Sequence, residues 1–169
     1  FRRVLFRSVA ASALPAYQPN LANGLTTFNA GGCSSCHAVP KQDDRTKLCG
    51  GLAIPSPFGT FYAPNISPDP NDGIGRWSEA DFVTAVMKGT SPSGTHYFPA
   101  FPYTSYQHAR VNDVRDLFAY LKTLPPVAGK VRELLASKTL RTFDRKNERA
   151  AAEKFYSARD YAPVFTKAG

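Results

Sequence analysis

The chain has 169 residues, a formal net charge of +8, and 14 prolines and 12 glycines. This length suits one domain of ordinary size, or a small domain with an appendage. No stretch approaches the roughly 20 apolar residues of a membrane-spanning helix, so we expect a soluble or peripheral protein. The basic charge comes with no nucleic-acid-binding motif, and we expect no nucleic-acid partner.

Residues 1–16 are typical of something other than a folded domain. Arg2 and Arg3 precede a short apolar stretch, and Ala11-Ser12-Ala13 has the small-x-small form of a signal-peptidase site. A truncated secretory signal and an artefact at the start of a gene fragment explain this pattern equally well. We therefore expect the first domain to begin at residue 17.

Residues 20–29 follow Pro19 and place Leu21, Leu25 and Phe28 at helical spacing. This spacing predicts a helix, weakened by Gly24, that ends at Gly31 and Gly32.

The sequence Cys33-Ser34-Ser35-Cys36-His37 follows directly. Two thiols three positions apart can each add to one vinyl group of a porphyrin, and the adjacent imidazole is then held as an axial ligand of the iron. A zinc site needs a second pair of ligands, but Cys49 stands alone. A redox pair expects a βαβ setting, and a structural disulfide does not explain His37. We therefore predict one covalently attached haem c on Cys33 and Cys36, with His37 as an iron ligand.

Residues 40–76 are rich in proline and predict a loop. A helix begins after the candidate cap Ser78, carries a stripe of Phe82, Val83, Val86 and Met87, and ends at Gly89. After a second loop, Asn112 caps a predicted helix that reaches Thr123 and stops before Pro125 and Pro126.

This order of elements resembles a class I cytochrome c, which implies an all-α fold of few short helices wrapped around the haem by long loops. The match covers about residues 20–127. It includes GGL at 50–52, SPFGTFY at 56–62, NISPD at 65–69, GIG at 73–75, YFPA at 97–100 and LPPV at 124–127. The chain is similar to the cytochrome c domains of bacterial membrane-bound alcohol and gluconate dehydrogenases and to related single-haem proteins. The resemblance implies an exported, periplasmic electron carrier between a dehydrogenase and a quinone-linked complex or an oxidase.

The sixth iron ligand departs from the family pattern. The family's methionine slot holds Phe101, and the position of a later methionine in similar sequences holds Ala109. Met87, the only methionine, lies on an apolar stripe, where core packing is its expected role. His108 is the first candidate for a distal ligand, and His96 matches a position that is not a ligand. An open, five-coordinate iron is the alternative, which would make the protein a peroxidase or a small-gas ligand binder or sensor.

Other residues have supporting roles in this interpretation. The carbonyl held by Pro40 is expected to accept from the His37 ring. Cys49 is expected to be an unpaired thiol, with an intermolecular disulfide as the alternative. The apolar wall of the haem pocket is predicted to comprise Leu52, Ile54, Pro57, Phe58, Tyr62, Trp77, Phe98 and Phe101.

The resemblance ends near residue 128. Residues 129–169 predict a basic, helical tail, since residues 130–169 hold ten Lys and Arg against five Asp and Glu. Such charge suits an acidic redox partner or a membrane surface, but a solvated tail without a partner is equally consistent.

Overall fold

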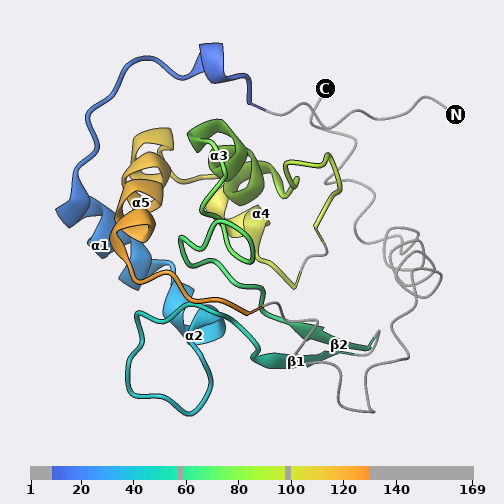
Figure 1. Cartoon of the computed structure of the whole chain (residues 1–169). Coiled ribbons are helices and arrows are strands. Elements are labelled where there is room, and N and C mark those ends of the chain that lie inside the picture. Colours follow the sequence, from blue (N-terminus) through green and yellow to red (C-terminus); the bar gives the residue numbers. More distant parts are fainter. Residues whose placement is uncertain (1–8, 57–58, 98–99, 130–169) are drawn as a thin grey trace, which may run out of the picture.

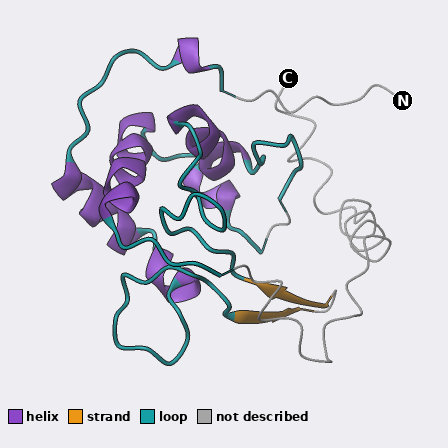
Figure 2. Ribbon diagram, viewed as in Figure 1, coloured by secondary structure: helices purple, strands orange, loops and turns teal. Residues whose placement is uncertain are grey.

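A computed structural model describes residues 9–56, 59–97 and 100–129, and the expected helical tail lies outside these residues. Most of the path is loop, with short helices around it and one hairpin at the edge (Figure 2). The elements in chain order are a 3-10 turn η1 (Ala11–Ala13), α1 (Leu21–Ala30), α2 (Cys33–His37), β1 (Ala53–Ser56), β2 (Gly59–Tyr62), α3 (Glu79–Lys88), α4 (Tyr103–Tyr106) and α5 (Val111–Thr123).

Helices α1 and α5, the first and last long helices, pack directly against each other (Figure 1). Gly24 of α1 lies against the Asp116 carbonyl, and a Cβ built there would stand 2.7 Å from the Tyr120 Cβ. The Phe28 ring packs on the Tyr120 ring with centroids 5.4 Å apart. Gly24 was expected only to weaken α1, whereas it is the point of closest approach to α5.

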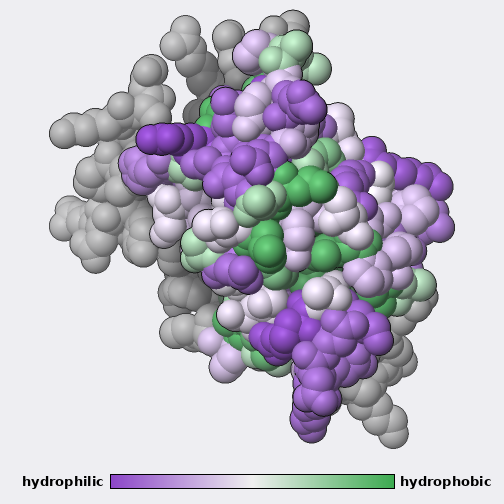
Figure 3. Space-filling view, turned by 90° about the vertical axis from the view of Figure 1, so that its left-hand side faces the viewer, coloured by the Kyte–Doolittle hydropathy of each residue, from purple (hydrophilic) through white to green (hydrophobic). Residues whose placement is uncertain are grey.

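The apolar stripe expected on α1 is only partly buried. Phe28 is buried, but Leu21 and Leu25 are 48% and 42% exposed, because the helix turns its Gly24 face toward α5. Figure 3 shows the side of the molecule that carries these helices, where apolar surface is interspersed with polar surface.

Asp116 ties the chain before α1 to α5. Its carboxylate accepts hydrogen bonds from the Asn20 backbone N–H (2.8 Å), the Asn23 amide (2.8 Å) and the Tyr17 hydroxyl (3.2 Å). Burial raises the pKa of Asp116, but these hydrogen bonds outweigh it and hold the pKa below its usual range. The ionised carboxylate therefore stabilises the α1–α5 crossing.

Helix α3 begins as the sequence predicts. The Ser78 hydroxyl accepts from the Asp81 N–H while the Asp81 carboxylate accepts from the Ser78 N–H, which forms a capping box. Gly89 ends the helix with φ 63°, and its bare backbone lies against the Tyr103 ring of α4. The Phe82 ring stacks on the Phe118 ring of α5, with centroids 4.8 Å apart. Helix α3 therefore packs against α5 in the hydrophobic core.

Three details differ from the predicted elements. The loop expected over 40–76 contains an antiparallel β1–β2 hairpin that pairs Ala53 with Tyr62, so the all-α description holds only in part. The second loop contains the short helix α4. Helix α5 begins at Val111 after Arg110, which makes no side-chain cap, so Asn112 is not the capping residue.

Residues 9–16, which the sequence assigns to a signal-like or artefactual segment, lie against the helices. The Val9 N–H donates to the Thr84 hydroxyl at 2.8 Å, and Val9 and Leu14 pack on the core. No helix within the described residues is long and apolar enough to span a bilayer.

We predict that Gly24→Ala lowers the free energy of unfolding by about 1–3 kcal/mol, because a methyl group must force α1 away from α5. Urea denaturation of the holoprotein measures this loss. Asn29→Ala, on an exposed position of the same helix, serves as the control and is expected to change stability by less than about 0.5 kcal/mol.

We expect Asp116→Asn to cost about 1–3 kcal/mol, because an amide cannot accept from all three donors. Since the folded pKa of Asp116 is depressed, its contribution is present above about pH 4 and is lost as pH falls through the folded pKa. Melting temperatures between about pH 7 and pH 3 should therefore converge for the two proteins at the acidic end. Asp113→Asn weakens only one hydrogen bond, which the Asn23 amide donates, so it should lower the stability less than Asp116→Asn. An equal loss of stability would show that Asp116 does not hold the chain before α1 against α5.

Candidate haem site

Helix α2 presents the two thiols of the CxxCH motif side by side. Gly32 adopts φ 64°, which lets the chain turn sharply from α1 into α2. Cys33 and Cys36 are three positions apart in a helix and so lie on one face. Both are free thiols and both are half-buried.

Cys33 does not have the electrostatics of a redox-active pair. Burial raises the pKa of Cys33 to about 11; a hydrogen bond with its own backbone opposes this shift, and the nearby Cys36 adds to it. Reactive thiols in disulfide exchange have a lowered pKa, so the thioredoxin-like alternative has no support in this geometry.

The His37 ring is oriented by the backbone of a distant loop. Its Nδ1 lies 2.8 Å from the Pro64 carbonyl oxygen, which leaves Nε2 as the nitrogen available to a metal. Burial lowers the pKa of His37, although the Pro64 hydrogen bond opposes this shift. The imidazole is therefore neutral near pH 7, which is the form that ligates metals. The contact expected from Pro40 is wrong: Pro64 makes it, and Pro40 is exposed.

A backbone clamp holds the Pro64 carbonyl in place. The Gly50 N–H donates to the His37 carbonyl at 2.7 Å, and the Gly51 N–H donates to the Ala63 carbonyl at 2.8 Å. Gly50 has φ 80°, and a Cβ there would meet the Pro64 oxygen at 2.5 Å and the Ala63 oxygen closer still. Only glycine allows this segment to pass between His37 and Pro64.

An aromatic cluster lies close to α2 and consists of Tyr97, Phe101, Tyr103 and Tyr106. The Phe101 ring lies 5.8 Å from the rings of Tyr97 and Tyr106 and 6.4 Å from that of Tyr103. The Tyr106 hydroxyl donates to the Gly31 carbonyl at 2.8 Å. A Cβ at Gly31 would lie 3.5 Å from the Cys33 Sγ and 3.8 Å from the Tyr106 ring, so Tyr106 brings one edge of the cluster close to Cys33.

The predicted wall residues are described in part. Five of them lie within the described residues and are half-buried: Leu52, Ile54, Tyr62, Trp77 and Phe101. Half-burial suits side chains that cover a prosthetic group on one side and contact protein on the other. Pro57, Phe58 and Phe98 lie outside the described residues. Sequence reasoning missed Pro64, Tyr106 and the clamp at Gly50, for which the adjacent glycines were the available signal.

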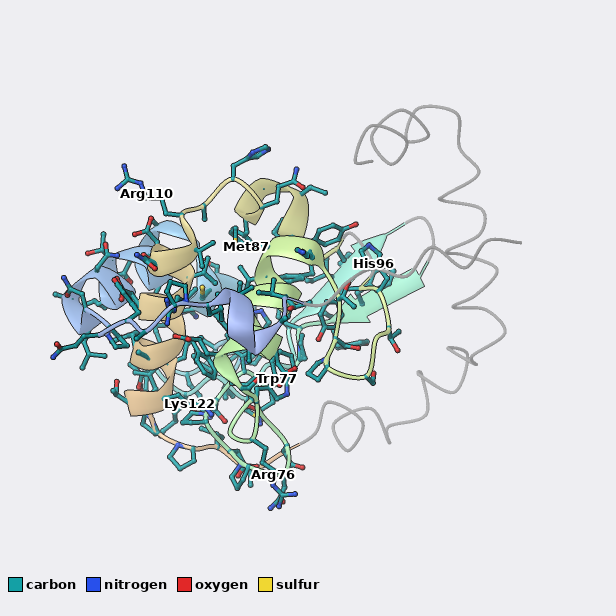
Figure 4. All side chains as sticks on the ribbon, turned by 90° about the horizontal axis from the view of Figure 1, so that it is seen from above. Arg76, Trp77, Met87, His96, Arg110 and Lys122 are labelled. Atoms are coloured by element: carbon teal, nitrogen blue, oxygen red, sulfur yellow. The ribbon has the colours of Figure 1, made fainter. Side chains whose placement is uncertain are left out.

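The remaining candidate ligands lie in different surroundings. His108 is exposed, with its Nε2 3.3 Å from the Gln107 amide nitrogen. The His96 Nε2 lies 3.0 Å from the Tyr103 hydroxyl. Met87 packs against the core, and Figure 4 shows it well apart from His96.

The residues present fit a covalent haem c. They supply two free thiols one helical turn apart and a neutral imidazole with Nε2 available. Tyr106, of the aromatic cluster, lies close to Cys33. Cys49 stands apart as a buried free thiol, with its Sγ 3.6 Å from the Gly129 carbonyl oxygen.

Comparison with known proteins agrees with this geometry. The model of the cytochrome c family matches residues 21–125. The chain is 52% identical over 118 residues to a diheme cytochrome c-type protein of Cereibacter sphaeroides, a match that covers 64% of this chain and 40% of that protein. It is 46% identical over 107 residues to a nicotinate dehydrogenase subunit of Pseudomonas putida, covering 63% of this chain and 9% of that protein. It is 37% identical over 134 residues to the cytochrome c subunit of alcohol dehydrogenase (quinone) of Gluconacetobacter polyoxogenes, covering 76% and 28%. The chain thus spans less than half the length of these curated relatives.

We predict that Gly50→Ala raises the midpoint potential of the holoprotein and lowers its melting temperature. The new methyl group must displace the Pro64 carbonyl from His37, and the imidazole then becomes a weaker base. Spectroelectrochemistry and thermal denaturation measure the two effects.

Gly94→Ala is the matched control, because Gly94 has the same φ of 80° but a Cβ there meets nothing within 4 Å. Both variants carry the same backbone strain, and only Gly50→Ala carries the clash. Equal changes in potential for the two variants would contradict the proposed clamp.

Proposed function

The chain belongs to the cytochrome c family, and from this premise we propose that it is a periplasmic electron carrier with one haem c. The observation that carries the proposal is the site on α2, where Cys33, Cys36 and the Pro64-oriented His37 converge. A single CxxCH motif in the sequence supports a single haem in this chain, although one relative is named as a diheme protein.

Bound haem c supplies a one-electron couple at the iron. The protein's residues hold and orient that group: Cys33 and Cys36 would form the two thioether links, and the His37 Nε2 would bind the metal. The hydrogen bond to Pro64 keeps the ring in one tautomer and one orientation. With haem bound, the half-buried apolar side chains would lower the polarity around the iron.

The expected partners follow from the relatives. The similar proteins of Pseudomonas putida and Gluconacetobacter polyoxogenes are named as parts of a nicotinate dehydrogenase and an alcohol dehydrogenase. We propose that this chain accepts electrons from a dehydrogenase and delivers them to a quinone-linked complex or an oxidase. Export to the periplasm is proposed on chemical grounds, since covalent haem attachment to such motifs is completed outside the bacterial cytoplasm.

Charge contributes little to docking by the described domain. Residues 9–129 hold eight Lys and Arg against eight Asp and Glu, and the excess of basic residues lies in residues 1–8 and 130–169. Any electrostatic steering of an acidic partner would therefore come from those segments, and peripheral membrane association is proposed on the same basis.

Expression of the full chain with a haem c maturation system tests the proposal. We expect a coloured protein whose intact mass includes one covalently bound haem, with reversible one-electron reduction and sharp α and β bands. Cys33→Ala and Cys36→Ala should each leave at most one thioether, which the pyridine haemochrome spectrum detects.

Cys49→Ala is the matched control. The buried Cys49 thiol contacts the carbonyls of Ala128 and Gly129 rather than the CxxCH motif. This variant should therefore keep both thioethers and the same spectrum. Colourless, matured material without added mass would refute the haem site. A haem protein that no dehydrogenase can reduce would refute the carrier role alone.

A further inference from the structure

The sequence contains few side chains that commonly ligate haem iron: three histidines, one methionine and three cysteines. Cys33, Cys36 and His37 serve attachment and proximal ligation in the proposed function. Cys49 is buried near the carbonyls of Ala128 and Gly129. Among the histidines, methionine and cysteines of the sequence, only Met87, His96 and His108 therefore remain as candidates for the sixth iron ligand.

Met87 is engaged elsewhere. It lies on α3, is half-buried and packs against the hydrophobic core. It also lines a cavity of about 410 Å³ with Val9, Leu14 and Val111, under the segment that precedes α1. Its thioether therefore lies between α3 and the N-terminal segment.

The two histidines are also placed for other contacts. The His96 ring packs edge-on against Tyr103 at 5.1 Å, with its Nε2 within hydrogen-bonding distance of the Tyr103 hydroxyl. His108 is exposed at the end of the turn that follows α4, beside Gln107.

Tyr97, Tyr106 and Lys122 are poorly suited to this position. A phenol binds iron well only as phenolate, and burial raises the pKa of Tyr97 to about 12. The Tyr106 hydroxyl is committed to the Gly31 carbonyl. Lys122 donates to the carbonyls of Ile74 and Gly75.

The aromatic cluster determines which ligand suits such an iron. Phe101 presents an apolar ring, and the hydroxyl groups of Tyr103 and Tyr106 already have partners. Bound dioxygen and bound anions are stabilised by hydrogen-bond donors, and this surface has few donors available. Carbon monoxide and nitric oxide bind without such donors, so the surface suits them better.

We propose that the distal position of the haem iron is open to a small neutral diatomic gas, such as carbon monoxide or nitric oxide, with no described side chain as sixth ligand. This proposal rests on the proposed function, because it requires the haem. Gas binding would stop electron transfer at this site, so the same centre would respond to the gas through its redox activity.

Carbon monoxide added to the dithionite-reduced, full-length holoprotein is the test. We expect the Soret band to shift within the mixing time, and we expect a high-spin ferric form by electron paramagnetic resonance. His108→Ala should leave both spectra unchanged. Phe101→Met offers a thioether from the aromatic cluster and should give a low-spin form with at least tenfold weaker carbon monoxide binding.

Phe101→Leu is the control for Phe101→Met, since it alters the ring without adding a donor atom and should still bind carbon monoxide. A low-spin wild type that does not bind the gas overturns the proposal, and loss of that low-spin form in His108→Ala or His96→Ala would identify the ligand. These outcomes still require a coloured, haem-loaded protein. Absence of haem would instead refute the proposed function.

Discussion

The hydrogen bond between the His37 ring and the Pro64 carbonyl is the contact on which the site depends. It joins α2 to a loop 27 residues further along the chain and selects the nitrogen that faces the metal. The Pro64 loop reaches this position through Gly50. The Gly50 N–H donates to the His37 carbonyl, and the bare Gly50 backbone lies directly against the backbone of Ala63 and Pro64. The ligand geometry is therefore set by backbone contacts of glycine and proline, and side-chain chemistry is needed only at the imidazole and the two thiols.

The α1–α5 crossing provides the frame for this loop structure. Gly24 lets the helices approach, Asp116 fixes the chain that enters α1, and Phe82 extends the contact to α3. The wall side chains predicted at Leu52, Ile54, Tyr62, Trp77 and Phe101 are only half-buried. A protein of this size with so little regular structure gains from a large apolar prosthetic group, because the group adds to the buried apolar surface. Folding and haem attachment are thus coupled through the same residues.

Local signals made much of the fold predictable. The Ser78 box and Gly89 bound α3 as expected, and α5 ends at Thr123 as predicted, before Pro125 and Pro126. The CxxCH motif located the thiols and the proximal histidine. Three long-range features were not predicted from the sequence: the hydrogen bond between Pro64 and His37, the close approach of α1 to α5 at Gly24, and the β1–β2 hairpin. The strands of the hairpin are only four residues long, and the first contains Pro55. The first two features depend on residues distant in sequence, which periodicity and capping rules do not address. The expected wall at Phe58 and Phe98 and the distal role of His108 stay predictions.

Electron carriage and gas binding make opposing demands on the distal face. A carrier favours two strong axial ligands, since an unchanged coordination sphere keeps reorganisation small, whereas a gas binder requires one position to be open. The Pro64 carbonyl orients the proximal imidazole, whereas Phe101, at the position of the family's methionine, contributes a ring without a donor atom. Ala109, at the position of the later methionine in similar sequences, offers no ligand either. The proposed open position follows from these two differences together, and it places gas binding and electron transfer at the same iron.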